Sequence, residues 1–143
     1  MASDAVFKVL NALHKGTVKL TGGRLGWQGG GMPMLELTTT GRKSGQPRTV
    51  MLSTPLEEGD TIVLVASRGG GEQNPAWFLN LVANREVQVS YKGAPARTMK
   101  ARVATPEERE RLWARIVADH PHYGGYQKKS TRQIPVVLLN PAG

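Results

Sequence analysis

The residues best suited to chemistry lie in two short segments rich in glycine and arginine. The first, residues 38–48 (TTTGRKSGQPR), combines the cations Arg42, Lys43 and Arg48 with two glycines and several hydroxyls. Free N–H groups of a glycine turn can form an anion-binding concavity, and arginine adds bidentate contacts to phosphate oxygens. The residue order differs from that of a Walker A loop. The pattern is about equally compatible with an anion site and with a solvated basic hairpin.

The second segment, residues 66–80 (ASRGGGEQNPAWFLN), leads from an expected strand through three glycines into an expected helix. We expect that helix to begin at Asn74-Pro75, with Asn as N-cap and Pro at the first helical position. A helix N-terminus after a glycine loop directs backbone donors and a positive dipole end toward one place. Arg68 adds a charge there. The alternatives are a plain connector for the glycines and core packing for Trp77.

A third group of residues, near the C-terminus, combines aromatic rings with glycines. Tyr123 and Tyr126 flank Gly124-Gly125, and these glycines would give an expected loop the freedom that a lid needs. The two tyrosines could equally be surface anchors whose hydroxyls remain hydrated. His120 and His122 are residues of a type that binds metals, but no third ligand is evident in the sequence, so no metal site is predicted.

Short strands and a few helices must position these residues. An amphipathic helix is expected at residues 4–15, followed by a glycine-rich loop to residue 31. A capping box, Thr105-Pro106-Glu107-Glu108, predicts the start of a later helix. Strands are expected at 34–39, 49–54, 61–66, 87–91, 98–103 and 134–139, with hairpin turns at 57–60 and 92–95. About six strands and two intervening helices favour an α+β fold with a mainly antiparallel sheet, which could close into a barrel.

Composition narrows the function classes. A chain of 143 residues suits one domain, 1–143, in which residues 1–31 form the N-terminal helix and loop. The absence of cysteine excludes disulfides and thiolate zinc sites. No secretory signal or membrane span is apparent, so a cytoplasmic protein is expected. Its amphipathic N-terminal helix could dock on the barrel, which is the favoured alternative, or contact a membrane surface. The net charge of +8 implies an anionic partner.

Four segments in order resemble the deazaflavin-dependent nitroreductase family. They are TTTGRKSGQPR, ASRGGGEQNPAWFLNL, ANREVQVSY and HPHYGGYQKKSTRQIPVV, and together they extend from about residue 35 to 137. The resemblance implies a split β-barrel related to flavin-mononucleotide-binding proteins. It also implies the cofactor F420, a deazaflavin with a phosphate and an oligoglutamate tail. Such a polyanion would account for the surplus of positive charge.

The resemblance also implies roles for individual residues. Arg42, Lys43 and Arg48 would face the tail and phosphate, and Ser67 and Arg68 match a Ser-Lys pair at the end of a strand. Tyr123 and Tyr126 match tyrosines on the substrate side of the ring, and His120 stands where members often have another tyrosine. The implied cofactor-binding residues are Arg42, Lys43, Arg48, Ala66, Ser67, Arg68, Trp77 and Asn80. The implied catalytic residues are Ser67, His120, Tyr123 and Tyr126.

The expected reaction is hydride transfer from the reduced deazaflavin to an electron-poor small molecule. The acceptor would be an α,β-unsaturated ester or lactone, such as a coumarin, or a nitroheterocycle. Two alternatives keep the same fold: a reductase that uses flavin mononucleotide (FMN) and a non-catalytic deazaflavin or flavin carrier. A nucleic-acid binder ranks last, because the basic residues lie in loops and aromatics are only 6% of the chain. The sequence does not indicate the oligomeric state.

Overall fold

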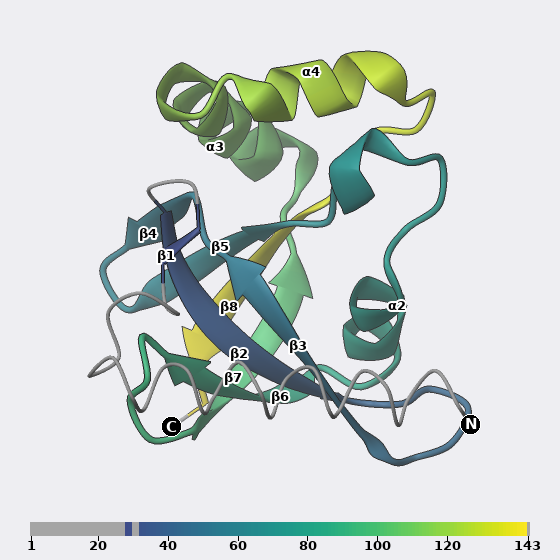
Figure 1. The fold of residues 1–143 in the computed structure, drawn as a ribbon, viewed down its shortest axis with the longest axis vertical. Coiled ribbons are helices and arrows are strands. Elements are labelled where there is room, and N and C mark those ends of the chain that lie inside the picture. The colour runs from purple at the N-terminus through teal and green to yellow at the C-terminus, as the bar shows by residue number, and fades with distance from the viewer. Residues whose placement is uncertain (1–27, 30–31, 143) are drawn as a thin grey trace.

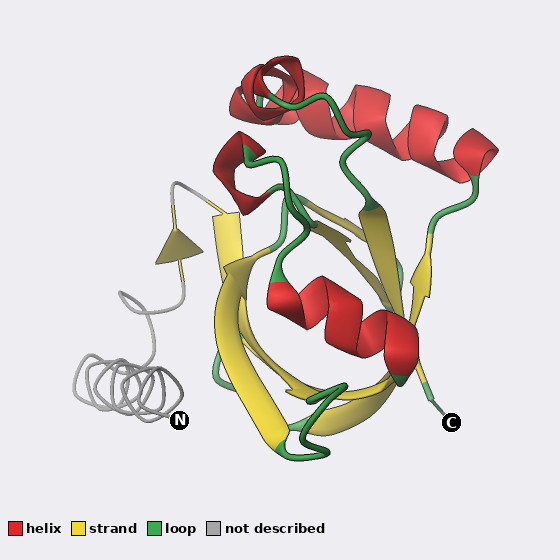
Figure 2. Ribbon diagram, turned by 90° about the vertical axis from the view of Figure 1, so that its right-hand side faces the viewer, coloured by secondary structure: helices red, strands yellow, loops and turns green. Residues whose placement is uncertain are grey.

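The structure, a computed structural model, describes residues 28–29 and 32–142. Its strands form one antiparallel sheet in the order β1-β2-β6-β7-β8-β5-β4, and β3 also pairs with β2. The sheet curls into a split barrel, as expected, with α2 across its open side and α3 and α4 over one end (Figures 1 and 2). The strands are β1 (Gln28–Gly29), β2 (Met32–Thr40), β3 (Pro47–Ser53), β4 (Leu56–Glu58), β5 (Thr61–Val65), β6 (Glu86–Tyr91), β7 (Arg97–Val103) and β8 (Val136–Pro141). The helices are the 3-10 turn η2 (Arg68–Gly70), α2 (Ala76–Ala83), α3 (Pro106–Asp119) and α4 (His122–Lys129).

Two apolar cores lie on opposite faces of the same strands. Side chains alternate between the faces of a strand, so successive residues of β8 serve different cores. Val137 and Leu139 enter the barrel interior, where Trp77, Phe78 and other α2 residues join them. Val136 and Leu138 instead join an outer core under α3 and α4. The continuous apolar run in β8 is therefore explained by burial on both faces.

Three local predictions are confirmed. The basic segment forms the β2–β3 hairpin, in which Thr40 pairs with Pro47. The β6–β7 hairpin is present, with Val87 opposite Met99. The capping box of α3 is complete, because the Thr105 side chain accepts from the Glu108 amide and the Glu108 side chain accepts from the Thr105 amide.

The predicted hairpin between residues 49–54 and 61–66 is wrong. β3 pairs with β2, whereas β5 pairs with β8 and with β4, a short strand that begins just before the expected turn and extends into it. Thr54 fixes this break: its buried hydroxyl lies 2.6 Å from the Val63 carbonyl oxygen and 3.0 Å from that of Leu56. The turn itself contracts to the residues between Glu58 and Thr61, where Gly59 has a φ of 59°.

The predicted start of α2 is displaced by one residue. Pro75 is the N-cap and lacks a capping side chain. The Asn74 side-chain oxygen instead accepts a hydrogen bond from Arg132, 2.8 Å away. The Asn74 oxygen that was expected to cap α2 is thus used to bond Arg132. The expected helix at residues 4–15 lies outside the described residues, as does most of the loop expected to extend to residue 31. Where that loop is described, Gln28–Gly29 is instead the short strand β1, which pairs with β2.

The predicted loop around the two tyrosines is wrong, because His122–Lys129 is the helix α4. Gly124 and Gly125 lower its intrinsic helical propensity, and tertiary packing overrides that weakness. Tyr123 is buried in the outer core. A Cβ on Gly124 would lie 3.3 Å from a Val117 methyl carbon, so glycine allows α3 and α4 to approach closely.

Candidate functional site

The basic β2–β3 turn presents its charges through side chains. The Gly41 amide donates to the Gln46 carbonyl at 2.8 Å, and the Gly45 amide donates to the Gly41 carbonyl at 2.8 Å. Because these glycine N–H groups stabilise the turn, they are not the anion donors that the sequence suggested. The side chains of Arg42 and Lys43 are exposed beside them and remain able to bind an anion.

Asn80 attaches this turn to α2. Its side-chain oxygen accepts from the Arg42 amide at 3.1 Å and from an Arg42 guanidinium nitrogen at 3.4 Å. Its amide nitrogen donates to the Thr39 hydroxyl at 3.2 Å. Asn80 is buried, and these side-chain hydrogen bonds go to the β2–β3 turn and to β2. Its position orients Arg42 relative to the helix.

The second segment forms a loop between β5 and α2, residues 66–75, which is called the glycine-rich loop from here on. The Ala66 amide donates to the Pro135 carbonyl at 3.0 Å, which holds this end of the loop against the residues before β8. Ser67 precedes η2 and is 9% exposed, and its hydroxyl makes no capping hydrogen bond. Arg68 is exposed, with an unusual positive φ of 48° and a guanidinium contact to Gln73 at 3.3 Å.

Gly70 brings this loop against the helix that carries the tyrosines. η2 packs on α4, and a Cβ on Gly70 would lie 3.0 Å from the Tyr126 carbonyl oxygen and 3.1 Å from its Cα. The φ of Gly70 is 88°, in the region that favours glycine. Ser67, Arg68 and Tyr126 are therefore brought to one region from distant parts of the sequence.

The aromatic residues divide into buried and accessible ones. Trp77 is in the inner core, with its ring 6.5 Å from that of Phe78 in an edge-to-face arrangement. Tyr123 is in the outer core, and burial raises the pKa of its hydroxyl to about 12. Tyr126 is only half-buried, and its ring lies 5.4 Å from that of His122. Among these three, Tyr126 has the most access to a bound molecule.

His120 lies at the C-terminal end of α3, beside this aromatic group. Its ring centroid is 6.1 Å from that of His122 and 6.4 Å from that of Tyr123. Within residues 28–29 and 32–142, no group of three or more His, Asp or Glu residues is placed to hold a metal ion.

The two predicted segments flank α2. Asn80 holds the β2–β3 turn near one part of this helix, and the glycine-rich loop leads into its N-terminus. Figure 1 shows α2 beside the barrel, between the β2–β3 turn and η2. The structure thus gathers Ser67, Arg68 and Tyr126 in one place and puts Arg42 and Lys43 in another. A ligand that contacts both groups must be elongated.

Sequence reasoning missed Arg132, which has the most extensive side-chain contacts at this site. Its guanidinium reaches oxygens of Ala66, Ser67, Gly71 and Asn74. The only available signal was its place in the segment just before the last strand, among other cations. A single sequence does not indicate which of several cations faces inward.

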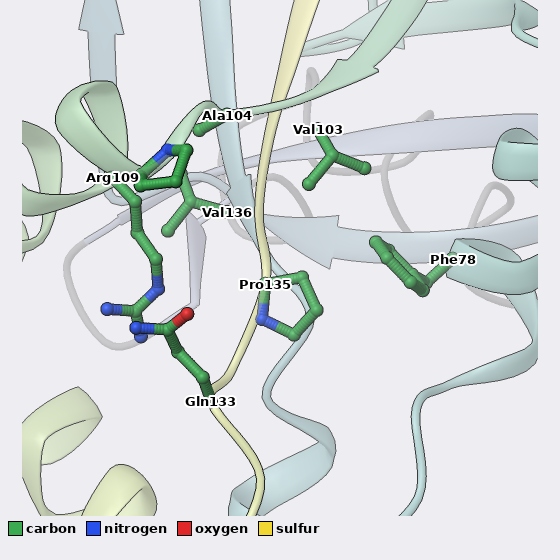
Figure 3. A pocket seen from close by; sticks show the side chains of 8 residues that line it. Phe78, Val103, Ala104, Arg109, Gln133, Pro135 and Val136 are labelled. Atoms are coloured by element: carbon green, nitrogen blue, oxygen red, sulfur yellow. The ribbon is translucent and has the colours of Figure 1, made fainter.

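A cavity of about 180 Å³ lies apart from the predicted residues. Figure 3 shows Phe78 on one side and Arg109 on the other, with Pro135 between them. The Arg109 guanidinium already donates to the Ile134 carbonyl and to the Gln127 side-chain oxygen, and it stacks over the Trp113 ring. The cavity is lined by Phe78, Val103, Ala104, Pro106, Arg109, Gln133, Pro135 and Val136.

Comparison with known proteins identifies close relatives. The family model described as F420H(2)-dependent quinone reductase matches residues 11–141. An F420H(2)-dependent quinone reductase of Mycobacterium tuberculosis (strain ATCC 25618 / H37Rv) is 37% identical over 131 residues, which are 89% of this chain and 87% of the relative.

Two solved structures are similar to this chain in both sequence and fold. A structure described as an F420-H2 dependent reductase (FDR-A) is 38% identical, with a TM-score of 0.66 over 76% of this chain and 94% of that one. Another, described as a domain-swapped dimer, is 34% identical, with a TM-score of 0.69 over 98% of this chain and 100% of that one.

Proposed function

Because the chain belongs to the F420H(2)-dependent quinone reductase family, a family of oxidoreductases, we propose that it transfers a hydride from reduced coenzyme F420 to a quinone-type acceptor. A quinone is an α,β-unsaturated carbonyl compound, so it falls in the same chemical class as the coumarin-type lactones expected from the sequence. Nitroheterocycles are a further candidate acceptor. In each case the substrate takes up one hydride and one proton.

The observation that carries the proposal is the contact between the glycine-rich loop and α4 at Gly70 and Tyr126. The loop supplies Ser67 and Arg68, and α4 supplies Tyr126. A reductase must hold its cofactor and its substrate face to face, so a cofactor loop packed on a helix with an accessible phenol is a suitable arrangement.

The residues present fit a polyanionic cofactor. Arg42, Lys43 and Arg68 are exposed cations, and Arg48 is half-buried beside Ser44. Charged hydrogen bonds to phosphate or carboxylate oxygens suit such side chains. The buried Ser67 hydroxyl, which makes no capping bond, fits a neutral polar atom of the ring system. When bound, the reduced deazaflavin supplies the hydride.

The protein's own groups then act on the acceptor. As the hydride arrives, negative charge develops on a carbonyl oxygen of the substrate. The Ser67 hydroxyl is the candidate donor that stabilises this charge. A proton must follow, and Tyr126, His120 and water are the candidate sources. The half-buried position of Tyr126 supports it over the buried Tyr123.

Titration with oxidised cofactors, followed by tryptophan fluorescence, tests the proposal. The protein should bind oligoglutamylated F420 more tightly than FMN, and high salt should reduce this preference because ionic contacts are screened.

Lys43→Ala should weaken F420 binding by roughly 1.5–3 kcal/mol if a charged hydrogen bond is lost. Lys100→Ala, which removes an exposed cation from β7, is the matched control and should leave binding unchanged.

Reduction of a quinone, a coumarin-type lactone and a nitroheterocycle by F420H2 then ranks the acceptors. Equal, salt-independent affinity for F420 and FMN would favour the FMN reductase instead. Tight F420 binding without reduction of any acceptor would favour the non-catalytic carrier. A cytoplasmic location remains a prediction.

A further inference from the structure

Arg132 is bonded to four oxygens of the glycine-rich loop. One terminal nitrogen, Nη2, lies 3.1 Å from the carbonyl oxygens of both Ala66 and Ser67. The other, Nη1, lies 2.8 Å from the Asn74 side-chain oxygen, and Nε lies 3.0 Å from the Gly71 carbonyl oxygen. These acceptors span the loop from the end of β5 almost to the start of α2. One planar group therefore bonds to both ends of the loop and to Gly71 between them.

The neighbours of Arg132 make the same connection. The Thr131 amide and hydroxyl both donate to the Glu72 carboxylate, and the Ser130 hydroxyl lies 3.4 Å from the Gly71 carbonyl oxygen. The bonds from Thr131 lower the pKa of Glu72. The segment before β8 thus holds the loop at several points along its length.

On its other side, Arg132 is connected to α4. The Gln127 side-chain nitrogen donates to the Arg132 carbonyl oxygen at 2.7 Å, while the Gln127 oxygen accepts from the Ile134 amide at 2.9 Å. Gln127 directly follows Tyr126 in α4. Residues 130–134 therefore bond both to the loop that carries Ser67 and to the helix that carries Tyr126.

We propose that Arg132 is a positioning residue that holds the glycine-rich loop in its cofactor-binding shape and in register with Tyr126. Its side chain is directed to the loop oxygens, so it acts through Ser67 and Arg68 and not by contact with the substrate. The inference rests on the proposed function for the identity of the ligand. The role of Arg132 in the loop itself does not depend on that identity.

The geometry requires a guanidinium. Arginine presents its donors as a rigid planar fork, whereas lysine offers a single ammonium nitrogen on a flexible stem. One ammonium group cannot reach the Gly71 carbonyl, the Asn74 side chain and the Ala66 carbonyl in three directions at the observed distances. Lysine at this position would keep the positive charge but lose the simultaneous hydrogen bonds to the loop.

The test uses Arg132→Lys and Arg132→Ala in the full chain. Arg102→Ala is the control, since it removes a guanidinium whose partner is Glu108, away from the loop. Both Arg132 variants should weaken F420 binding and raise the KM for F420H2 by about tenfold or more, as expected when a hydrogen-bonded charged group is lost. Their kcat at saturating cofactor should change less than KM. Added ethylguanidinium, but not ethylamine, should restore affinity in Arg132→Ala.

Hydrogen exchange of the loop amides, measured without cofactor, provides an independent readout. Exchange at residues 68–74 should increase in both Arg132 variants and remain parental in Arg102→Ala. Restoration of affinity by Arg132→Lys would overturn the proposal, because charge alone would then suffice. So would parental cofactor affinity in Arg132→Ala. If the parental protein fails to bind F420, the proposed function is wrong. If hydrogen exchange of the loop is unchanged in Arg132→Ala, the role of Arg132 in holding the loop is wrong.

Discussion

At the scale of single residues, the structure separates groups that can contact a ligand from groups that build the site. Arg42, Lys43 and Arg68 are exposed, and these cations remain candidates for cofactor binding. Asn80 is buried and holds the β2–β3 turn. Trp77 lies mainly in the inner core, the alternative that its pattern had left open.

The two tyrosines predict different phenotypes. Tyr126→Phe removes only the hydroxyl of an accessible ring and should lower turnover by about 10²–10⁴-fold if that hydroxyl is the proton donor. Tyr123→Phe removes a weak contact, 3.7 Å from the Met32 sulfur, and should leave turnover nearly parental. Steady-state reduction of the best acceptor, with a parallel F420 titration, checks both variants.

Neither substitution should change F420 affinity. A loss of affinity in step with activity would move Tyr126 to the cofactor shell. Parental turnover in Tyr126→Phe would leave His120 or water as the proton source.

At the scale of elements, α4 shows how tertiary contacts produce a helix that the local sequence disfavours. Tyr123 is buried in the outer core, Gly70 lies against the Tyr126 backbone, and Gln127 bonds to the segment before β8. These contacts fix one side of the helix. Gly124 then allows close packing against α3 instead of lid motion.

The two glycines of α4 should respond differently to alanine. A Cβ on Gly125 meets nothing within 4 Å, so Gly125→Ala should raise the free energy of unfolding by about 0.5–1 kcal/mol through helix propensity and lower unfolded-state entropy. Gly124→Ala gains the same propensity but places its Cβ 3.3 Å from Val117 Cγ1. It should therefore be less stable than Gly125→Ala.

Urea denaturation of the two variants and the parental protein measures these differences. If Gly125→Ala is destabilising, this residue is not in a helix and the lid interpretation returns.

At the scale of the whole molecule, the barrel and the helical layer are joined by ion pairs as well as by the outer core. Glu108 at the start of α3 bonds to Arg102 of β7, and Glu58 of β4 bonds to Arg111 and Arg115 of α3. No helix in the described part of the chain is long and apolar enough to cross a membrane. The N-terminal helix expected at residues 4–15, for which contact with a membrane surface was one alternative, is outside that part.

Acid should weaken the attachment of α3 to the barrel. The Arg102 guanidinium, with help from the Thr105 amide, lowers the pKa of Glu108 from 4.5 to about 2. Because the pKa is lower in the folded state, the stabilisation is present above pH 4.5 and is lost as the pH falls toward about 2. Arg111 likewise lowers the pKa of Glu58.

Urea denaturation between pH 7 and pH 2.5 checks this. Glu108→Gln should cost roughly 1 kcal/mol at pH 7, as for a partly exposed ion pair with good geometry. The difference from the parental protein should shrink below pH 4. Glu110→Gln, at an exposed position of the same helix, is the control and should show little difference at either pH. A Glu108→Gln deficit that persists unchanged at pH 2.5 would indicate lost packing instead of lost charge.

Local chemistry determined much of this protein from sequence alone. Glycines and a basic turn placed the β2–β3 hairpin, and the capping box placed the start of α3. The resemblance to a known family, and not these patterns, indicated a split barrel and a polyanionic cofactor. The hairpin and the start of α3 depend on contacts within a few residues, which a sequence displays.

Only the tertiary structure decided which side chains face a ligand and which hold the site together. The four bonds of Arg132 join residues 58 to 66 positions apart, and the Asn80 bond to Arg42 spans 38. The helix α4 forms because distant residues bury Tyr123 and meet Gly70, against the local preference of its glycines. Such contacts depend on which distant segments the tertiary fold brings together. The spacing of residues along a single sequence does not show this.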